Sequence, residues 1–261
     1  MNSSNQSPPS GRPLWIINPR CTTTFEKKYS RPEIDGHRCF AKQSLSLEEA
    51  SLKHRRPEAT SYSARERLRN EAGALAFISQ NTEIPVPDIV RYYDDREIVA
   101  IALAPVPGVQ MRMIQDRESR VEVCRQIDDF VAQMREITNP EATGFAGHLC
   151  AHPMVSGRAY PEPIAPIPPT PGVIYPMCHG DLNASNVIVN PDSARVTGII
   201  DWEYAGFYPE IMDFPYYKTA ISSPLKFNTA MYPRGYLDAS RNELKRLARM
   251  SSNPQSTGLA A

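Results

Sequence analysis

The sequence predicts an α+β protein in two parts: a small N-terminal antiparallel sheet with one helix, and a larger, mainly helical C-terminal part that contains a β-hairpin. Three observations lead to this prediction. Strand-like runs flank the pair Asp35-Gly36, two later segments repeat apolar residues at helical spacing, and two short apolar runs with polar ends lie within residues 186–200. A chain of 261 residues is long enough for two lobes.

The composition excludes several kinds of partner. Lys plus Arg and Asp plus Glu both number 29, so no net charge attracts the chain to nucleic acid or to an anionic membrane. The 5 cysteines form no CxxC pair, which is typical of reduced thiols. We find neither a secretory signal nor a run of the roughly 18 apolar residues that a membrane helix needs. We therefore expect a cytoplasmic protein that binds neither nucleic acid nor membrane, in an oligomeric state that the sequence does not indicate.

The N-terminal part, residues 13–103, begins with strands. The runs CTTTFEKKYS and HRCFAKQSL are rich in strand-forming residues and are separated by Pro32 and by Asp35-Gly36, a common hairpin turn. The second run ends near Lys42. A small antiparallel sheet is expected here.

One helix and one buried strand complete this part. Ser63 and Glu66 can form a capping box, and apolar residues then recur at helical spacing, so the helix carries Glu71. The run REIVAIALAPVPG predicts a buried strand that leads into a Pro/Gly connector at residues 104–106. Such a connector can join two lobes.

The C-terminal part, residues 107–248, begins with a predicted helix. The stretch VEVCRQIDDFVAQMREI places its apolar residues on one stripe, which favours packing inside a lobe. Residues 155–176 hold seven prolines, which predicts an irregular surface segment without helix or central strand. Residues 1–12 and 249–261 are polar or small and are expected to be disordered tails.

The stretch MCHGDLNASNVIVNPDSARVTGIIDWEYAG carries the chemistry. Two strands, 186–189 and 196–200, are joined by an Asn-Pro-Asp turn, and such a hairpin brings Asp181 and Asn186 next to Asp201. Two carboxylates and one amide suit Mg²⁺. Phosphoryl transfer requires such a metal site, together with an acid that receives the proton of the acceptor hydroxyl.

The motifs are specific enough to indicate a family. HGDLNASN resembles the H-G-D-x-x-x-x-N catalytic loop of the aminoglycoside phosphotransferase and choline kinase superfamily, and IIDWEYAG resembles its metal-binding strand end. VTGIIDWEYAGFYPE is especially similar to the variant abundant in fungal genomes. The resemblance implies a two-lobed, protein-kinase-like fold and a transferase that moves the γ-phosphoryl group of ATP, with Mg²⁺, to a hydroxyl of a small molecule.

The resemblance also implies roles for residues of this segment. Asp181 corresponds to the catalytic acid or base, and His179 to the residue that braces the loop by hydrogen bonds. Asn186 and Asp201 correspond to the Mg²⁺ ligands, and Asp213 to an aspartate that ties down the catalytic loop.

The nucleotide-binding residues implied by the resemblance lie earlier in the chain. Lys42 is similar in place to the lysine that contacts the nucleotide phosphates, and Glu71 would hold it in an ion pair. The adenine would lie against the backbone near Ala102, Ala104 and Val106. A competitor for the acid is Glu49, although a capping role is favoured for it because Ser46 lies three residues earlier.

A zinc site is an alternative use of the histidines. His148, Cys150 and His152 alternate along the chain and could be joined by Cys178 or His179. Their spacing matches no structural zinc pattern, so ordinary loop residues are the favoured interpretation.

Two alternatives to an active enzyme stay open, namely a catalytically inactive kinase-like binding protein and a truncated family member. No glycine-rich loop precedes Lys42, where the only glycines are Gly11 and Gly36, and the chain after Asp201 is short. Retention of all three polar residues of the hairpin favours an enzyme. Its acceptor can be a sugar, an amino alcohol or a secondary metabolite.

Overall fold

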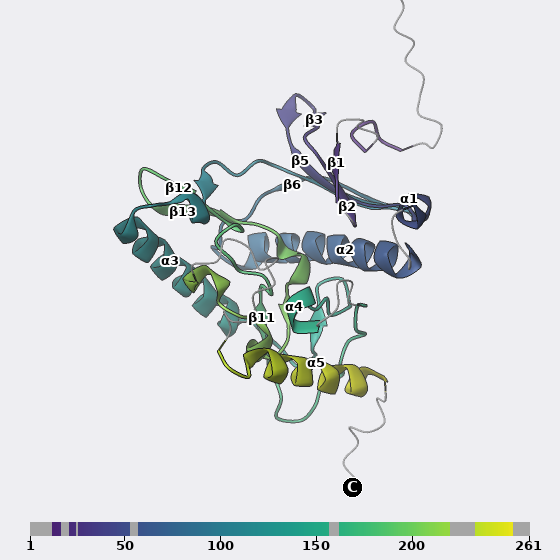
Figure 1. Ribbon diagram of the computed structural model, residues 1–261, viewed down its shortest axis with the longest axis vertical. Coiled ribbons are helices and arrows are strands. Elements are labelled where there is room, and N and C mark those ends of the chain that lie inside the picture. The colour runs from purple at the N-terminus through teal and green to yellow at the C-terminus, as the bar shows by residue number, and fades with distance from the viewer. Residues whose placement is uncertain are drawn as a thin grey trace, which may run out of the picture. The chain divides into compact units, whose positions relative to one another are not determined.

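The computed structural model describes residues 12–16, 21–24, 26–52, 57–156, 162–219 and 233–252, without the side chains of 57–61 (Figure 1). Helices and antiparallel sheets occur together along these residues, which confirms the predicted α+β class. Most of the predicted terminal tails lies outside the described residues. Of the helices that the structure describes, none combines the length and the apolarity that crossing a membrane requires.

The chain divides into two compact units. The first consists of Met1–Leu68 and Asp88–Pro105, and the second of Arg69–Pro87 and Val106–Ala261. Each unit is described below by itself.

The first unit contains a five-stranded antiparallel sheet. Its strands, in spatial order, are β1 (Cys21–Thr23), β2 (Lys27–Ser30), β5 (Phe40–Ser44), β7 (Val99–Leu103) and β6 (Ile89–Asp94). A small hairpin, β3 (Glu33–Ile34) with β4 (His37–Arg38), separates β2 from β5. Its turn residues Asp35 and Gly36 have φ of 52° and 80°. These positive angles are those of the predicted Asp-Gly hairpin turn.

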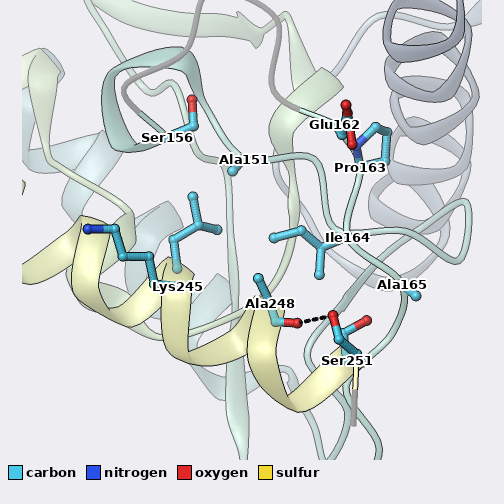
Figure 2. A pocket seen from close by; sticks show the side chains of 11 residues that line it. Ala151, Ser156, Glu162, Pro163, Ile164, Ala165, Lys245, Ala248 and Ser251 are labelled. Atoms are coloured by element: carbon cyan, nitrogen blue, oxygen red, sulfur yellow. Dashed lines mark hydrogen bonds between the residues drawn. The ribbon is translucent and has the colours of Figure 1, made fainter. Parts of the chain in front are cut away.

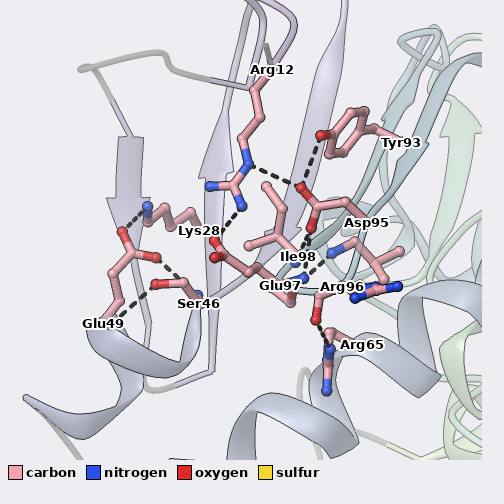
Figure 3. A network of polar contacts seen from close by, with 12 residues as sticks. Arg12, Lys28, Ser46, Glu49, Arg65, Tyr93, Asp95, Arg96, Glu97 and Ile98 are labelled. Atoms are coloured by element: carbon pink, nitrogen blue, oxygen red, sulfur yellow. Dashed lines mark hydrogen bonds and ion pairs between the residues drawn. The ribbon is translucent and has the colours of Figure 1, made fainter. Parts of the chain in front are cut away.

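The short helix α1 (Leu47–Ser51) is held at its start by a capping box. The Ser46 hydroxyl accepts the Glu49 N–H at 3.2 Å, and the Glu49 carboxylate accepts the Ser46 N–H at 3.0 Å. Glu49 also forms an ion pair with Lys28 (Figure 3). The capping role favoured for Glu49 is therefore confirmed, and its carboxylate is engaged within the first unit.

Helix α2 (Pro57–Asn81) confirms the predicted helix around Glu71 but begins earlier than expected. The boundary between the two units falls within it, after Leu68. The predicted capping box at Ser63 is wrong, because Ser63 lies inside the helix and its carbonyl accepts a hydrogen bond from Arg67. Pro57 begins the helix, a position where the missing N–H has no consequence.

The second unit contains two antiparallel sheets as well as helices. The four-stranded sheet has the order β10 (Thr143–Gly144), β14 (Gly206–Phe207), β11 (Tyr175–Cys178) and β9 (Thr138–Asn139). The three-stranded sheet has the order β13 (Arg195–Ile199), β12 (Val187–Asn190) and β8 (Val109–Gln110). β12 and β13 form the predicted hairpin, with boundaries within one residue of those expected. It is this hairpin that positions the candidate site.

Three helices accompany these sheets: α3 (Arg117–Glu136), α4 (Pro153–Ser156) and α5 (Tyr236–Ser252). α3 is the predicted amphipathic helix and buries Val123, Ile127 and Met134. α5 packs on α4 (Figure 1), and its last turn extends into residues that the sequence assigned to the C-terminal tail.

The expectation for the proline-rich segment is partly wrong. Ile167 is fully buried and its N–H donates to Ala142 at 2.9 Å, so the segment is not only surface. Pro176 lies in β11, a central strand. It fits there because its carbonyl still accepts the Tyr208 N–H at 3.3 Å, while the Met177 N–H donates to Ile137 at 2.9 Å.

Candidate active site

Asp181 lies on the loop between β11 and β12, with only 8% of its surface exposed. Asn183 Nδ2 donates to its Oδ1 at 3.0 Å, and Asn186 Nδ2 donates to its Oδ2 at 3.1 Å. Each carboxylate oxygen therefore keeps a lone-pair site. The structure thus brings Asp181 and Asn186 into contact, as expected.

Asp201 follows β13 at the same end of the hairpin. The Ile200 N–H donates to the Asn186 carbonyl at 2.9 Å, which fixes the backbone of Asp201 beside that of Asn186. Asp201 has φ 69° and ψ 53°, a left-handed conformation that is unusual outside glycine, asparagine and aspartate. The three polar residues predicted for the metal and the proton therefore lie around the mouth of one hairpin.

The electrostatics of this mouth reflect the crowding of carboxylates. Burial, and then the nearby charge of Asp201, raise the pKa of Asp181 well above its usual value, against the opposing hydrogen bonds from Asn183 and Asn186. A neighbouring negative charge disfavours the ionised form of a buried carboxyl group. A cation bound nearby would stabilise the ionised carboxylates of Asp181 and Asp201.

The donor set fits a hard divalent cation. Asn186 uses its Nδ2 on Asp181, while its Oδ1 accepts no hydrogen bond from the described residues. That amide oxygen and the Asp201 carboxylate are ligands of the type that Mg²⁺ prefers. Among the described residues, no group of three or more His, Cys, Asp or Glu side chains can hold a metal ion, so the zinc alternative gains no support.

His179 connects the loop that carries Asp181 to the end of the hairpin. Its Nδ1 accepts the Asp181 N–H at 3.2 Å, so Nε2 carries the hydrogen and donates to the Ile200 carbonyl at 3.2 Å. Its ring packs against Trp202 with centroids 4.3 Å apart. The buried imidazole thus braces the loop as the sequence implied, while its effect on catalysis stays a prediction.

Gly180 is held by Asp213. The Asp213 carboxylate accepts the Gly180 N–H at 2.8 Å and the Arg135 Nη2–H at 2.8 Å. Arg135 also donates to the Met177 carbonyl at 2.6 Å. Burial is the largest influence and would lower the pKa of Arg135, but the charge and hydrogen bond of Asp213, together with the charges of Cys178 and Glu210, raise the pKa. Asp213 therefore ties down the loop as expected, with a partner on α3 that the sequence did not reveal.

Asn70 on α2 is a second residue that the sequence analysis missed. Its Nδ2 donates to the Glu203 carbonyl at 3.1 Å and to the Ala205 carbonyl at 2.7 Å, and its Oδ1 accepts the Phe145 N–H at 2.7 Å. A fully buried asparagine with these partners fixes the chain just after Asp201. Glu203 is itself buried, and its main chain is held by this contact.

His152 is the third residue whose position the sequence analysis did not indicate. Its Nε2 lies 3.7 Å from Asp181 Oδ1, and only 5% of the residue is exposed. No motif links residues 152 and 181, so only the folded chain reveals this approach.

Ala151, the residue before His152, is one of the residues that line a cavity of about 410 Å³. Figure 2 shows α5 on one side, with Lys245 and Ala248, and the chain around Ala151 and Ile164 on the other. Its remaining lining includes Glu162 and the hydroxyl side chains of Ser156, Ser251 and Ser252. The volume is within the range of small-molecule sites.

The predicted nucleotide residues occur in both units. Lys42 lies on β5 and Ala102 on β7, in adjacent strands of the first unit, and the Ala104 N–H donates to Asp88 at 2.9 Å. Glu71 and Val106 belong to the second unit. Lys42 and Glu71 are both buried, and their ion pair stays a prediction.

Comparison with protein families gives a match to part of the chain. Residues 176–246 match the phosphotransferase enzyme family, APH. The matched segment begins in β11 and includes His179, Asp181, Asn186 and Asp201. The family resemblance drawn from the motifs is thereby confirmed for this part of the chain. Comparison with curated proteins gives no match.

Solved structures of three aminoglycoside phosphotransferases are similar to the chain. An aminoglycoside-3'-phosphotransferase of type VIII has a TM-score of 0.47 and 16% identity, over 95% of this chain and 91% of that one. A thermostable mutant of APH(4)-Ia, solved with ADP and hygromycin B, has a TM-score of 0.44 and 11% identity, over 91% and 78%. APH(3'')-Id from Streptomyces rimosus has a TM-score of 0.41 and 13% identity, over 89% and 93%. Scores this low support no conclusion about substrate or cofactor.

Proposed function

We propose that the chain is a small-molecule kinase that transfers the γ-phosphoryl group of ATP to a hydroxyl group. One observation carries this proposal: Asp181, Asn186 and Asp201 surround the mouth of one hairpin within the segment that matches a phosphotransferase family. Carboxylate and amide oxygens in this arrangement are the parts that phosphoryl transfer needs.

In the proposed reaction Asp181 acts as the base. The O–H bond of the acceptor breaks and its proton passes to the Asp181 carboxylate, while the acceptor oxygen forms a bond to the γ-phosphorus. The bond between that phosphorus and the β,γ-bridging oxygen breaks, and ADP leaves. Asn183 and Asn186 hold the carboxylate in place through one hydrogen bond to each oxygen.

Asn186 and Asp201 are the proposed ligands of Mg²⁺, which when bound would neutralise charge on the nucleotide phosphates. Lys42, supported by Glu71, is proposed to contact the phosphates, and the backbone near Ala102, Ala104 and Val106 the adenine. These assignments rest on the resemblance of the chain to the family.

The acceptor is proposed to occupy the cavity beside α5. Ala151 lines this cavity and immediately precedes His152, which approaches Asp181. The cavity wall offers hydroxyl, carboxylate and ammonium groups over an apolar floor, which suits a hydroxylated molecule such as a sugar or an amino alcohol.

The first test is Mg²⁺-dependent ATP binding by calorimetry, followed by hydrolysis of ATP with water as acceptor. We expect Asp201→Asn to weaken Mg²⁺-dependent binding and chelation of Mg²⁺ to have the same effect. Asp181→Asn should leave binding intact and lower hydrolysis by at least about 100-fold, the usual contribution of a general base.

Absence of ATP binding to the intact chain at millimolar ATP would contradict the proposal, as would unchanged turnover in Asp181→Asn. Asp192→Asn serves as a matched control, because Asp192 is an exposed aspartate in the turn of the same hairpin and should leave both measurements unchanged.

A further inference from the structure

His152 has a fixed ring orientation in the second unit. Its Nδ1 accepts the Met154 N–H at 3.2 Å. The ring meets Tyr204 edge to face, with centroids 4.9 Å apart, and lies 6.2 Å from the ring of Tyr216. The ring is therefore held by its own loop and by aromatic residues of the chain after Asp201.

The hydrogen bond to Nδ1 determines which ring nitrogen of His152 carries the hydrogen, and that nitrogen is the one near Asp181. Because Nδ1 accepts a hydrogen bond, the hydrogen of the neutral ring is on Nε2. Nε2 lies 3.7 Å from Asp181 Oδ1, which is too far for a direct hydrogen bond. At a separation beyond about 3.5 Å, one oxygen atom that contacts both groups can take the place of the direct hydrogen bond.

Asp181 has lone pairs for such a bridge. Oδ1 accepts one hydrogen bond, from Asn183, and Oδ2 accepts one from Asn186. Apart from these amides and His152, no described side chain forms a hydrogen bond or ion pair with the carboxylate, so a lone pair on Oδ1 stays available toward His152.

We propose that His152 is a catalytic residue that binds the nucleophile: its Nε2–H donates to the hydroxyl oxygen whose proton Asp181 accepts. This inference rests on the proposed kinase function and adds a residue to it. An oxygen that donates to Asp181 and accepts from His152 keeps its second lone pair for the γ-phosphorus. The O–H proton passes to Asp181, and the His152 proton stays on Nε2 throughout.

Water can replace the unidentified acceptor in the test, because the same two groups would hold a water molecule. The measurement is the rate of Mg²⁺-dependent ATP hydrolysis, with ATP binding followed separately by calorimetry. His152→Ala is expected to lower kcat for hydrolysis about tenfold, the effect of losing one hydrogen bond to the nucleophile. The dissociation constant for ATP should not change.

A second variant separates hydrogen bonding from packing. His152→Gln retains an N–H donor near the position of Nε2 and should recover most of the lost rate, whereas His152→Leu fills similar space without a donor and should behave like His152→Ala. His37→Gln is the control for the same substitution, since His37 is exposed in β4 of the first unit, and it should hydrolyse ATP at the normal rate.

The possible failures are distinguishable. If His152→Gln and His152→Leu lower kcat for ATP hydrolysis equally while ATP binding and thermal unfolding stay normal, His152 does not bind the nucleophile. The same conclusion follows if neither variant changes kcat. If the intact chain neither binds nor hydrolyses ATP, the proposed function fails and this inference fails with it. If Asp181→Asn loses ATP hydrolysis while the His152 variants keep the normal rate, the proposed kinase function stands and the proposed role of His152 is wrong.

Discussion

Gly180 is a residue at which backbone angle and packing both exclude a side chain. Its φ is +83°, and an added Cβ would lie 2.6 Å from the Tyr208 hydroxyl and 2.7 Å from the Tyr204 carbonyl. We expect Gly180→Ala to destabilise the protein by about 2–5 kcal/mol, from left-handed strain together with overpacking. Urea unfolding measures this change.

Gly172 provides the matched control for that variant. It has a similar φ of +76°, but no atom lies within 4 Å of an added Cβ. Gly172→Ala should therefore cost only the strain, about 1–2 kcal/mol. Equal losses in the two variants would mean that the contacts of Gly180 with the tyrosines do not matter.

Individual residues differ in how far the sequence reveals them. Asp181, Asn186 and Asp201 were predictable, because all three lie at the ends of two strands joined by a short turn, and local hairpin geometry brings them together. Asn70 and His152 were not, since their partners lie far away in the sequence. A buried polar side chain gives no periodic signal, and its contacts appear only when the chain has folded.

At the scale of elements, the first described residues are anchored to the turn after β6. Asp95 Oδ2 accepts Arg12 Nε at 3.1 Å and the Tyr93 hydroxyl at 2.9 Å, and its Oδ1 accepts the N–H groups of Glu97 and Ile98, both at 2.7 Å (Figure 3). Partial burial alone would raise the pKa of Asp95, but these hydrogen bonds together lower it to about 2.

This lowered pKa predicts a pH-dependent stability. The ionised Asp95 stabilises the fold above its unfolded pKa of about 3.9, and this contribution is lost as the pH falls through the folded value of about 2. Asp95→Asn should lower the free energy of unfolding by about 1–2 kcal/mol at neutral pH, allowing for partial solvent screening. The gap between the variant and the parent should narrow between about pH 4 and 2. A constant gap in urea titrations would contradict this.

The cavity beside α5 gives a second prediction at this scale. Ala248 lines it, so Ala248→Trp should fill space that the acceptor is proposed to use. Transfer to any acceptor found in a screen of hydroxylated compounds should fall by at least about tenfold, whereas ATP hydrolysis with water should persist. Asn242→Trp places the same side chain on the exposed face of α5 and is the control. Equal transfer by both variants would place the acceptor elsewhere.

Elements with local signals were predicted well. The β3–β4 turn, α3 and the β12–β13 hairpin follow from Asp-Gly, amphipathic and strand-turn-strand patterns. β11 was not foreseen, because proline content argues against a central strand. Pro176 is nonetheless accommodated there by partners on β9 and β14, which are distant in sequence.

For the molecule as a whole, the sequence predicted the α+β class and the family resemblance of residues 176–246 better than the strand content of the second unit. Short strands such as β9, β10 and β14 contain two residues each and carry no periodicity that a sequence can show. They form because buried backbone groups on neighbouring segments must be paired. The sheets of the second unit are therefore a product of its tertiary packing.

The left-handed backbone of Asp201 also limits how this protein can change over evolutionary time. In a copy no longer selected for activity, the carboxylate at this position can be replaced. The fold would then be kept chiefly where asparagine or glycine takes its place, because these residues tolerate φ near +69°. β-Branched or bulky replacements would strain the hairpin end and lower the amount of folded protein. Among descendants of this chain, asparagine or glycine at position 201 would therefore indicate a protein that still folds but lacks the proposed metal-binding carboxylate.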